Sequence, residues 1–140
     1  MFYRSLRLAA SLAIAVVTTT AHADSHAAGD AVKGKKVFKK CAACHNIGEG
    51  AKIKVGPPLT DVVGRKAASF DGFKYGKSIA AAGEAGLVWS EEELFDYLVN
   101  PKNFLRAKLE NKKAKSKMAF RLKKEQDRAD VIAYLKSLNM

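Results

Sequence analysis

The five-residue motif Cys41-Ala42-Ala43-Cys44-His45 constrains the possible folds of this chain more than any other part of its sequence. C-x-x-C-H is the attachment signature of c-type haem. Each thiol can add to one vinyl group of the porphyrin, and the two-residue spacer sets the sulfurs at a suitable separation. His45 then lies beneath the ring, with its imidazole directed at the iron. The motif therefore predicts one covalently bound haem c, attached through Cys41 and Cys44.

Other uses of a closely spaced cysteine pair must be weighed against this interpretation. A thioredoxin-type redox pair would need a βαβ setting, for which the sequence gives no sign. A zinc site usually has four ligands, whereas the chain has only two cysteines and so no second cysteine pair. A plain structural disulfide remains open, although it does not require the adjacent histidine.

The first 23 residues have the three-part pattern of a secretory signal peptide. Arg4 and Arg7 form a positive start, an apolar run follows over 8–17, and a small-x-small sequence ends at Ala23. An apolar core of about ten residues is short for a membrane span, which needs about 20. We therefore expect residues 1–23 to be removed after export. An uncleaved anchor or a buried amino-terminal helix is the alternative.

The mature chain, residues 24–140, has the length of a single domain. Its formal charge is +9, because loss of the signal peptide removes two of the 25 Lys and Arg residues that give the whole chain +11. Such a charge favours an acidic partner. Export argues against nucleic acid. No apolar run reaches the roughly 18 to 20 residues of a spanning helix, so we expect no stable membrane insertion.

Local signals predict helices from Asp30 towards Cys41, over 90–100 and over about 124–138. Ser90 and Glu93 match a capping box, and Pro101 is expected to end the second helix. A basic, polar stretch follows over 102–117. Residues 46–78 are rich in Gly and Pro, and we expect mainly loop there.

Strand signals are weak, so the expected fold class is all-α, with short helices and long loops. Loops of this length argue either against this assignment or for a bound group that organises them.

Counting identifies a candidate for the second axial ligand. Only Met118 and Met140 remain once residues 1–23 are removed, and Met140 is the last residue. His26 lies near the new amino terminus, and His45 is already assigned. Met118 is therefore the best candidate sixth ligand, with a role as an apolar gap-filler as the alternative.

Taken together, the ordered motifs resemble those of class I cytochromes c, and most closely the periplasmic cytochrome c2 type. The resemblance covers about residues 29–138. Its matching segments are Gly29-Asp30, 33–38, the motif at 41–45, 56–59, 63–66, Trp89, 97–102, Lys117-Met118 and 128–135. It implies a single-domain class I cytochrome c fold, with three to five helices and long loops wrapped around one covalent haem.

The resemblance also implies roles for individual residues. The implied cofactor-binding set is Cys41, Cys44, His45, Met118, Pro57, Arg65, Tyr75, Trp89 and Tyr97, with His45 and Met118 as the metal ligands. Pro57 matches a proline whose carbonyl accepts a hydrogen bond from the proximal imidazole. Arg65, Tyr75 and Trp89 match positions around the haem propionates. Tyr97 matches a tyrosine near the methionine sulfur, and Ser116 falls where the family often has Thr.

The same comparison predicts that the first and last helices cross, through Gly34 and Phe38 on one and Val131, Tyr134 and Leu135 on the other. Without the resemblance, Trp89, Tyr97 and Phe38 would be interpreted as core aromatic residues. Arg65 would be interpreted as a solvated surface charge. Two segments depart from the short family pattern: an enlarged lysine-rich stretch over 105–117, and a small insertion between Tyr75 and Trp89.

His and Met at both axial positions leave no open site on the iron, which favours electron transfer over catalysis. The resemblance implies a soluble periplasmic one-electron carrier that is monomeric and is not an enzyme. It implies a cytochrome bc1-type donor, with a reaction centre, terminal oxidase or reductase as acceptor. A haem peroxidase or ligand sensor with a labile sixth position is the alternative function. An electron-carrying domain tethered to a membrane is a third.

Ten lysines cluster in sequence around the attachment and ligand segments: Lys39, Lys40, Lys52, Lys54, Lys112, Lys113, Lys115, Lys117, Lys123 and Lys124. We expect them to guide the protein onto acidic docking faces of membrane redox complexes. Solubility is the alternative role for these residues.

Overall fold

The computed structural model describes residues 27–139; the predicted signal peptide, His26 and Met140 lie outside the described residues. The described part contains five helices and no strand, apart from an isolated antiparallel bridge between Lys66 and Val88. The helices are α1 (Ala31–Phe38), α2 (Lys77–Glu84), α3 (Glu91–Val99), α4 (Pro101–Lys108) and α5 (Glu125–Lys136). The all-α prediction is confirmed. Among these helices none is long and apolar enough to cross a membrane.

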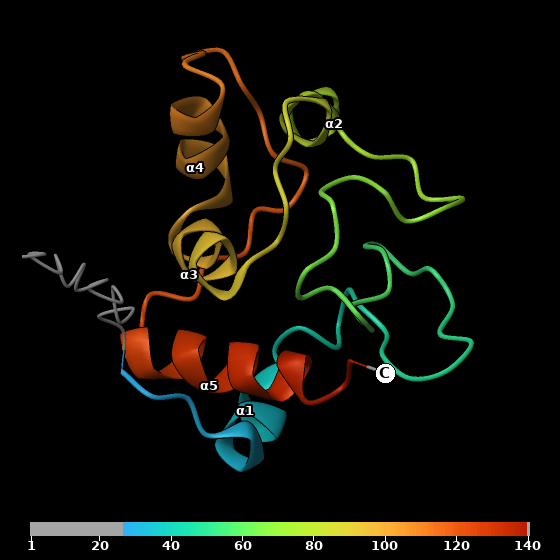
Figure 1. Ribbon diagram of the computed structural model, residues 1–140, viewed down its shortest axis with the longest axis vertical. Coiled ribbons are helices and arrows are strands. Elements are labelled where there is room, and N and C mark those ends of the chain that lie inside the picture. Colours follow the sequence, from blue (N-terminus) through green and yellow to red (C-terminus); the bar gives the residue numbers. More distant parts are fainter. Residues whose placement is uncertain (1–26, 140) are drawn as a thin grey trace, which may run out of the picture.

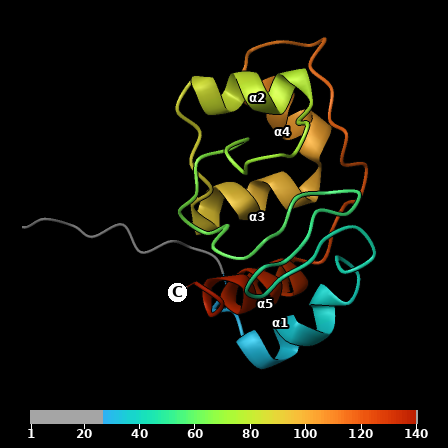
Figure 2. The same ribbon diagram turned by 90° about the vertical axis from the view of Figure 1, so that its right-hand side faces the viewer.

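The helices lie in tiers. α1 and α5 cross at one end of the molecule, α3 lies beside them, and α2 and α4 form the other end (Figures 1 and 2). The long loop between α1 and α2 runs along one side of this stack.

α1 and α5 pack backbone against backbone. A Cβ at Gly34 would lie 1.9 Å from the carbonyl oxygen of Asp130, so only glycine allows this approach. Phe38 meets Tyr134 edge to face, with ring centroids 5.7 Å apart. The predicted crossing of the first and last helices is therefore confirmed.

Two carboxylates hold the start of α1. The side chain of Asp30 accepts hydrogen bonds from the N–H groups of Val32 and Lys33, at 2.8 and 3.1 Å. The N–H of Asp30 donates to the carboxylate of Asp130, which is buried on α5. Negative charge at a helix amino terminus is favourable, so the predicted cap also ties α1 to α5.

Half of the predicted capping box at the start of α3 is present. The Ser90 hydroxyl accepts from the N–H of Glu93 at 3.1 Å. The Glu93 carboxylate does not complete the box: it pairs with Lys108 on α4, and the Ser90 N–H donates to the Val88 carbonyl.

The basic, polar stretch over 102–117 was not predicted to be helical, but residues 102–108 belong to α4. Pro101 ends α3 as expected, but it also begins α4, where a missing N–H costs nothing in the first helical turn. The side chain of Asn100 caps this turn by accepting from the N–H of Asn103 at 3.2 Å. The enlarged stretch is thus helical up to Lys108.

No helix was predicted over α2, whose start has no capping side chain. Its position depends on a distant contact: a Cβ at Gly83 would lie 2.2 Å from the carbonyl oxygen of Ala67. Small residues let α2 lie directly on the loop, which sequence periodicity does not register.

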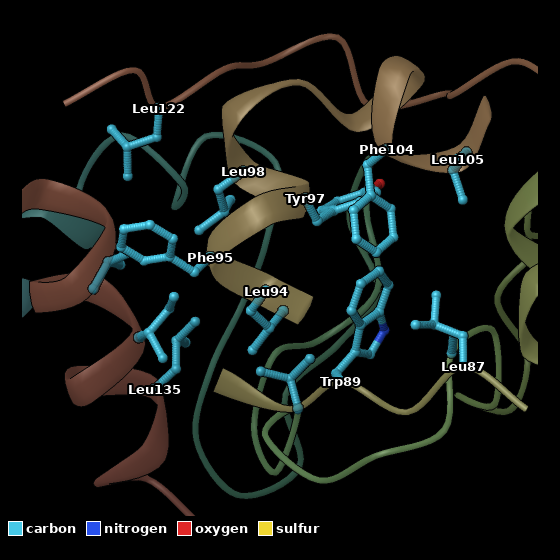
Figure 3. Packing of buried hydrophobic residues seen from close by; sticks show 14 of the residues in the cluster. Leu87, Trp89, Leu94, Phe95, Tyr97, Leu98, Phe104, Leu105, Leu122 and Leu135 are labelled. Atoms are coloured by element: carbon cyan, nitrogen blue, oxygen red, sulfur yellow. The ribbon is translucent and has the colours of Figure 1, made fainter. Parts of the chain in front are cut away.

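The core contains two adjoining groups of side chains (Figure 3). One is aromatic and contains Trp89, Tyr97 and Phe104; the other joins α3 to α5 and contains Leu94, Phe95, Leu98, Leu122 and Leu135. Arg128 on α5 is buried beside this second group. Its Nη1 donates to the carbonyls of Leu122 and Lys123, and its guanidinium lies 4.3 Å from the Phe95 ring centroid.

Replacement of Gly34 by Ala tests the helix crossing. Helix propensity alone would raise the free energy of unfolding by about 1 kcal/mol. The added methyl group would overlap a backbone carbonyl, and overpacking costs up to about 3 kcal/mol. We therefore expect the free energy of unfolding, measured by denaturant titration, to fall by a net amount of about 2 kcal/mol. Lys35→Ala, at an exposed position of the same helix, is the control; a more stable Gly34→Ala protein would contradict the close crossing.

Asp127 supports the same crossing in a pH-dependent way. Its hydrogen bond from Lys40, 3.0 Å long, holds the pKa of the carboxyl below its ordinary value of 3.8. The ionised form is therefore stabilising above that value, and this contribution is lost as pH falls through the lowered pKa. Asp127→Asn should lower the unfolding free energy by about 0.5–1 kcal/mol near neutrality.

Unfolding of both proteins across the acid range checks this expectation, because the two free energies should converge below pH 3.8. A difference that stays constant with pH would assign the effect to packing instead. Glu125→Gln, on the same turn of α5, controls for loss of a negative charge.

Candidate functional site

The motif cysteines and histidine occupy one tight turn directly after α1. The N–H of Cys41 donates to the Phe38 carbonyl at 2.8 Å, and those of Cys44 and His45 both donate to the Cys41 carbonyl at 3.0 Å. Cys41 is half-buried, Cys44 is exposed, and both are free thiols. Burial raises the pKa of the Cys41 thiol. Both sulfurs are thus available for thioether bonds.

The ring of His45 is held in one orientation. Its Nδ1 lies 2.7 Å from the carbonyl oxygen of Pro57. A carbonyl can only accept, so the hydrogen lies on Nδ1 and the lone pair on Nε2. Burial lowers the pKa of the imidazole, which favours this neutral form. The arrangement is that of a metal-ligating histidine oriented through its other nitrogen.

Gly56 forms a cradle for this ring. A Cβ at this position would lie 2.2 Å from Cε1 of His45 and 2.6 Å from its Nδ1. The N–H of Gly56 also donates to the Cys44 carbonyl at 2.8 Å. The backbone of the loop therefore supports one side of the imidazole where any side chain would displace it.

Arg65 is anchored on the same loop. Its Nη1 and Nη2 donate to the carbonyls of Thr60 and Pro58, at 3.1 and 2.9 Å. Its guanidinium also lies 5.5 Å from the Phe70 ring centroid. Burial lowers the pKa of Arg65, and nearby Tyr75 opposes that change. A fixed, half-buried guanidinium of this kind suits a carboxylate partner.

Tyr75 lies in the same corner. Its hydroxyl accepts a hydrogen bond from the N–H of Phe70 at 3.3 Å, and its ring meets Phe73 edge to face at 4.8 Å.

A short backbone pairing joins this loop to the aromatic group. The N–H of Gly64 donates to the Trp89 carbonyl at 2.7 Å, and the N–H of Trp89 donates to the Arg65 carbonyl at 2.9 Å. The ring centroids of Trp89 and Tyr97 lie 4.8 Å apart. Arg65, Trp89 and Tyr97, which are distant in sequence, are therefore brought together.

Met118 is connected to the aromatic group through Ser116, which neighbours Tyr97. The Ser116 hydroxyl donates to the carbonyl of Met118 at 2.9 Å. Burial raises the pKa of the Tyr97 phenol, and the neighbouring Ser116 hydroxyl opposes that change. Met118 itself is half-buried against the core.

The residues present fit a covalent haem. His45 offers an imidazole and Met118 a thioether, two side chains of the kind that bind haem iron in cytochromes. The close approach of Gly56 and the hydrogen bond to Pro57 hold the His45 ring in an orientation that suits a metal ligand.

Sequence reasoning missed two aromatic contributors. Phe104 meets Tyr97 at 5.4 Å in a T-shaped contact and Trp89 at 6.1 Å, so it completes the aromatic group (Figure 3). Phe70 lies against Arg65. Phe104 has a weak local signal, since it follows Asn100-Pro101 at helical spacing, whereas Phe70 lies in irregular chain that carries none.

Comparison with known proteins agrees with this site. The cytochrome c family model matches residues 31–139. Cytochrome c2 iso-1 of Rhodospirillum centenum is 51% identical over 117 residues, which cover 79% of this chain and 98% of the relative. Cytochrome c2 of Rhodobacter capsulatus is 46% identical, covering 91% of this chain and 96% of the relative.

Solved structures give the same result. Cytochrome c2 from Rhodospirillum centenum superposes with a TM-score of 0.77 at 48% identity, covering 80% of this chain and all of the other. Ferric cytochrome c-550 from Paracoccus versutus gives a TM-score of 0.73 at 44% identity, with coverages of 80% and 99%. The chain therefore belongs to the cytochrome c family of electron-transfer proteins, is not an enzyme, and has one covalently bound haem c as its cofactor.

Proposed function

We propose that this chain is a soluble periplasmic one-electron carrier whose haem iron is ligated by His45 and Met118. The observation that carries the proposal is the 2.7 Å contact between His45 Nδ1 and the Pro57 carbonyl, which leaves Nε2 as the donor. Cys41 and Cys44 supply the two thioether bonds. Residues 1–23 direct export and are removed, leaving a monomeric domain over 24–140.

The bound haem supplies an iron that cycles between the ferric and ferrous states. Pro57 orients His45 and increases its strength as a donor. Met118 would supply the second ligand to the iron, and its soft sulfur would favour the ferrous state. Arg65, Tyr75 and Trp89 would hold the propionates, and Tyr97 would lie next to the Met118 segment.

The proposed electron donor is a cytochrome bc1-type complex. The proposed acceptor is a reaction centre, a terminal oxidase or a reductase. A carrier between such complexes must bind and release quickly, which suits a small contact steered by charge.

The lysines support such steering. Four of the ten are engaged: Lys40 and Lys124 pair with Asp127, and the ammonium groups of Lys54 and Lys117 donate to backbone carbonyls. The other six are exposed, and their ammonium groups have no hydrogen bond or ion pair within the described residues: Lys39, Lys52, Lys112, Lys113, Lys115 and Lys123.

Met118→Ala tests the ligand assignment. The ferric protein should lose its weak sulfur-to-iron charge-transfer band. The ferrous protein should bind carbon monoxide with at least about tenfold higher apparent affinity, because the open form is no longer a minor species. Peroxidase activity should also rise. Met140→Ala, which removes the other methionine of the mature chain, should change none of these.

The alternative function, a haem peroxidase or ligand sensor, predicts a different starting point. The wild-type protein would then lack the charge-transfer band and bind carbon monoxide rapidly. Such a result, or an unchanged spectrum in Met118→Ala, would contradict ligation by Met118.

Ionic strength tests the docking proposal. The second-order rate constant for reaction with a purified bc1-type complex should fall about tenfold from low to physiological ionic strength. Lys123→Gln, beside the ligand segment, should slow the reaction more than Lys35→Gln on α1, although both remove one charge. A rate constant that does not change with salt would contradict steering.

A further inference from the structure

The segment before Met118, residues 111–117, is named here the strap. Its far end is fixed to α4. The Asn111 side chain accepts from the N–H of Lys113 at 2.9 Å, and Arg106 Nε donates to the carbonyl of Ala114 at 3.2 Å. Ala114 is only 2% exposed, so the strap is anchored there rather than solvated.

The near end of the strap is tied to a different part of the chain. The N–H of Lys115 donates to the hydroxyl of Ser78 on α2 at 3.0 Å, across 37 residues of sequence. The ammonium of Lys117 donates to the carbonyl of Lys74 at 2.6 Å. The contact with Ser78 joins the two segments in which this chain departs from the short family pattern, and the contact with Lys74 ties the strap to the chain just before the second of them.

The aliphatic part of Lys117 packs along the loop as well. A Cβ at Gly76 would lie 3.4 Å from its Cγ, an ordinary van der Waals distance, so the stem passes directly beside this glycine. The ammonium lies 6.0 Å from the Phe73 ring centroid, within the range of a cation–π contact. Lys117 therefore has a defined position although its side chain is exposed.

Between the two outward contacts, Ser116 points to the core. Its hydroxyl donates to the Met118 carbonyl at 2.9 Å, and it neighbours the buried phenol of Tyr97. Three consecutive residues of the strap are thus fixed, and Met118 follows directly after them.

We propose that Ser78 and Lys117 are positioning residues for the sixth iron ligand: by pinning the strap to the 73–78 segment, they keep Met118 on the iron. The inference rests on the proposed ligation by Met118. A net hydrogen bond changes an equilibrium about two- to tenfold. Loss of either contact should raise the population of molecules with Met118 displaced by that factor.

Imidazole binding to the ferric holoprotein measures this population, since imidazole enters only where Met118 has left. Ser78→Ala removes the acceptor and is favourable to helix α2. Lys117→Met removes the ammonium and keeps the stem. Each variant should bind imidazole about two- to tenfold more tightly than the wild type, with parallel loss of the charge-transfer band.

Matched variants separate positioning from charge and from overall stability. Lys112→Met removes the same charge from the strap and should bind imidazole as the wild type does. Ser78→Thr and Lys117→Arg retain the donors and acceptors and should restore wild-type affinity. Global unfolding, followed by far-UV circular dichroism, should change less than imidazole binding.

If Ser78→Ala and Lys117→Met bind imidazole as the wild type does, the positioning role is contradicted while the ligand assignment stands. An increase in imidazole affinity of the same size in Lys112→Met would have the same consequence. An imidazole effect fully matched by global destabilisation would overturn the positioning role too. Equal imidazole affinity of the wild type and Met118→Ala would instead overturn the ligand assignment itself, and the inference with it.

Discussion

At Gly34 the backbone of α1 lies against that of α5 so closely that one added carbon would overlap the Asp130 carbonyl. The attachment motif begins three residues after α1 ends, and the N–H of Cys41 is still bonded to the carbonyl of Phe38. The helix crossing therefore sets where the motif starts and in which direction His45 leaves it. The loop that follows then holds the His45 ring through Gly56 and Pro57.

The two sides of the site are anchored differently. On the histidine side, His45 is held by residues within about a dozen positions, through Pro57 and Gly56. On the methionine side, Met118 depends on contacts with segments 20 to 40 residues away in the sequence, including Tyr97 and Ser78. Local contacts form at a small loss of chain entropy and distant ones at a larger loss, so the methionine side is the more easily opened.

This difference also explains what the sequence could predict. α1 and α3 were predicted because Asp30 and Ser90 cap them locally, and α5 because of its apolar spacing. α2 lacks such a cap and depends on a distant contact. Pro101 was correctly expected to end α3, but the helix that it begins was not predicted, because a proline that ends one helix is equally suited to begin the next. The motif identified the cysteines and His45, whereas the contact of the strap with Ser78 spans 37 residues and leaves no local pattern.

The strap combines two demands that oppose each other. Its four lysines add positive charge next to the ligand segment, which favours docking on acidic surfaces. The same like charges repel one another along a short stretch of chain, and no carboxylate partner for their side chains lies within the described residues. Neutral groups hold the strap instead: the Ser78 hydroxyl and the Lys74 carbonyl. Such partners fix the strap without cancelling the charge, so that ligand retention and electrostatic docking can coexist in one segment.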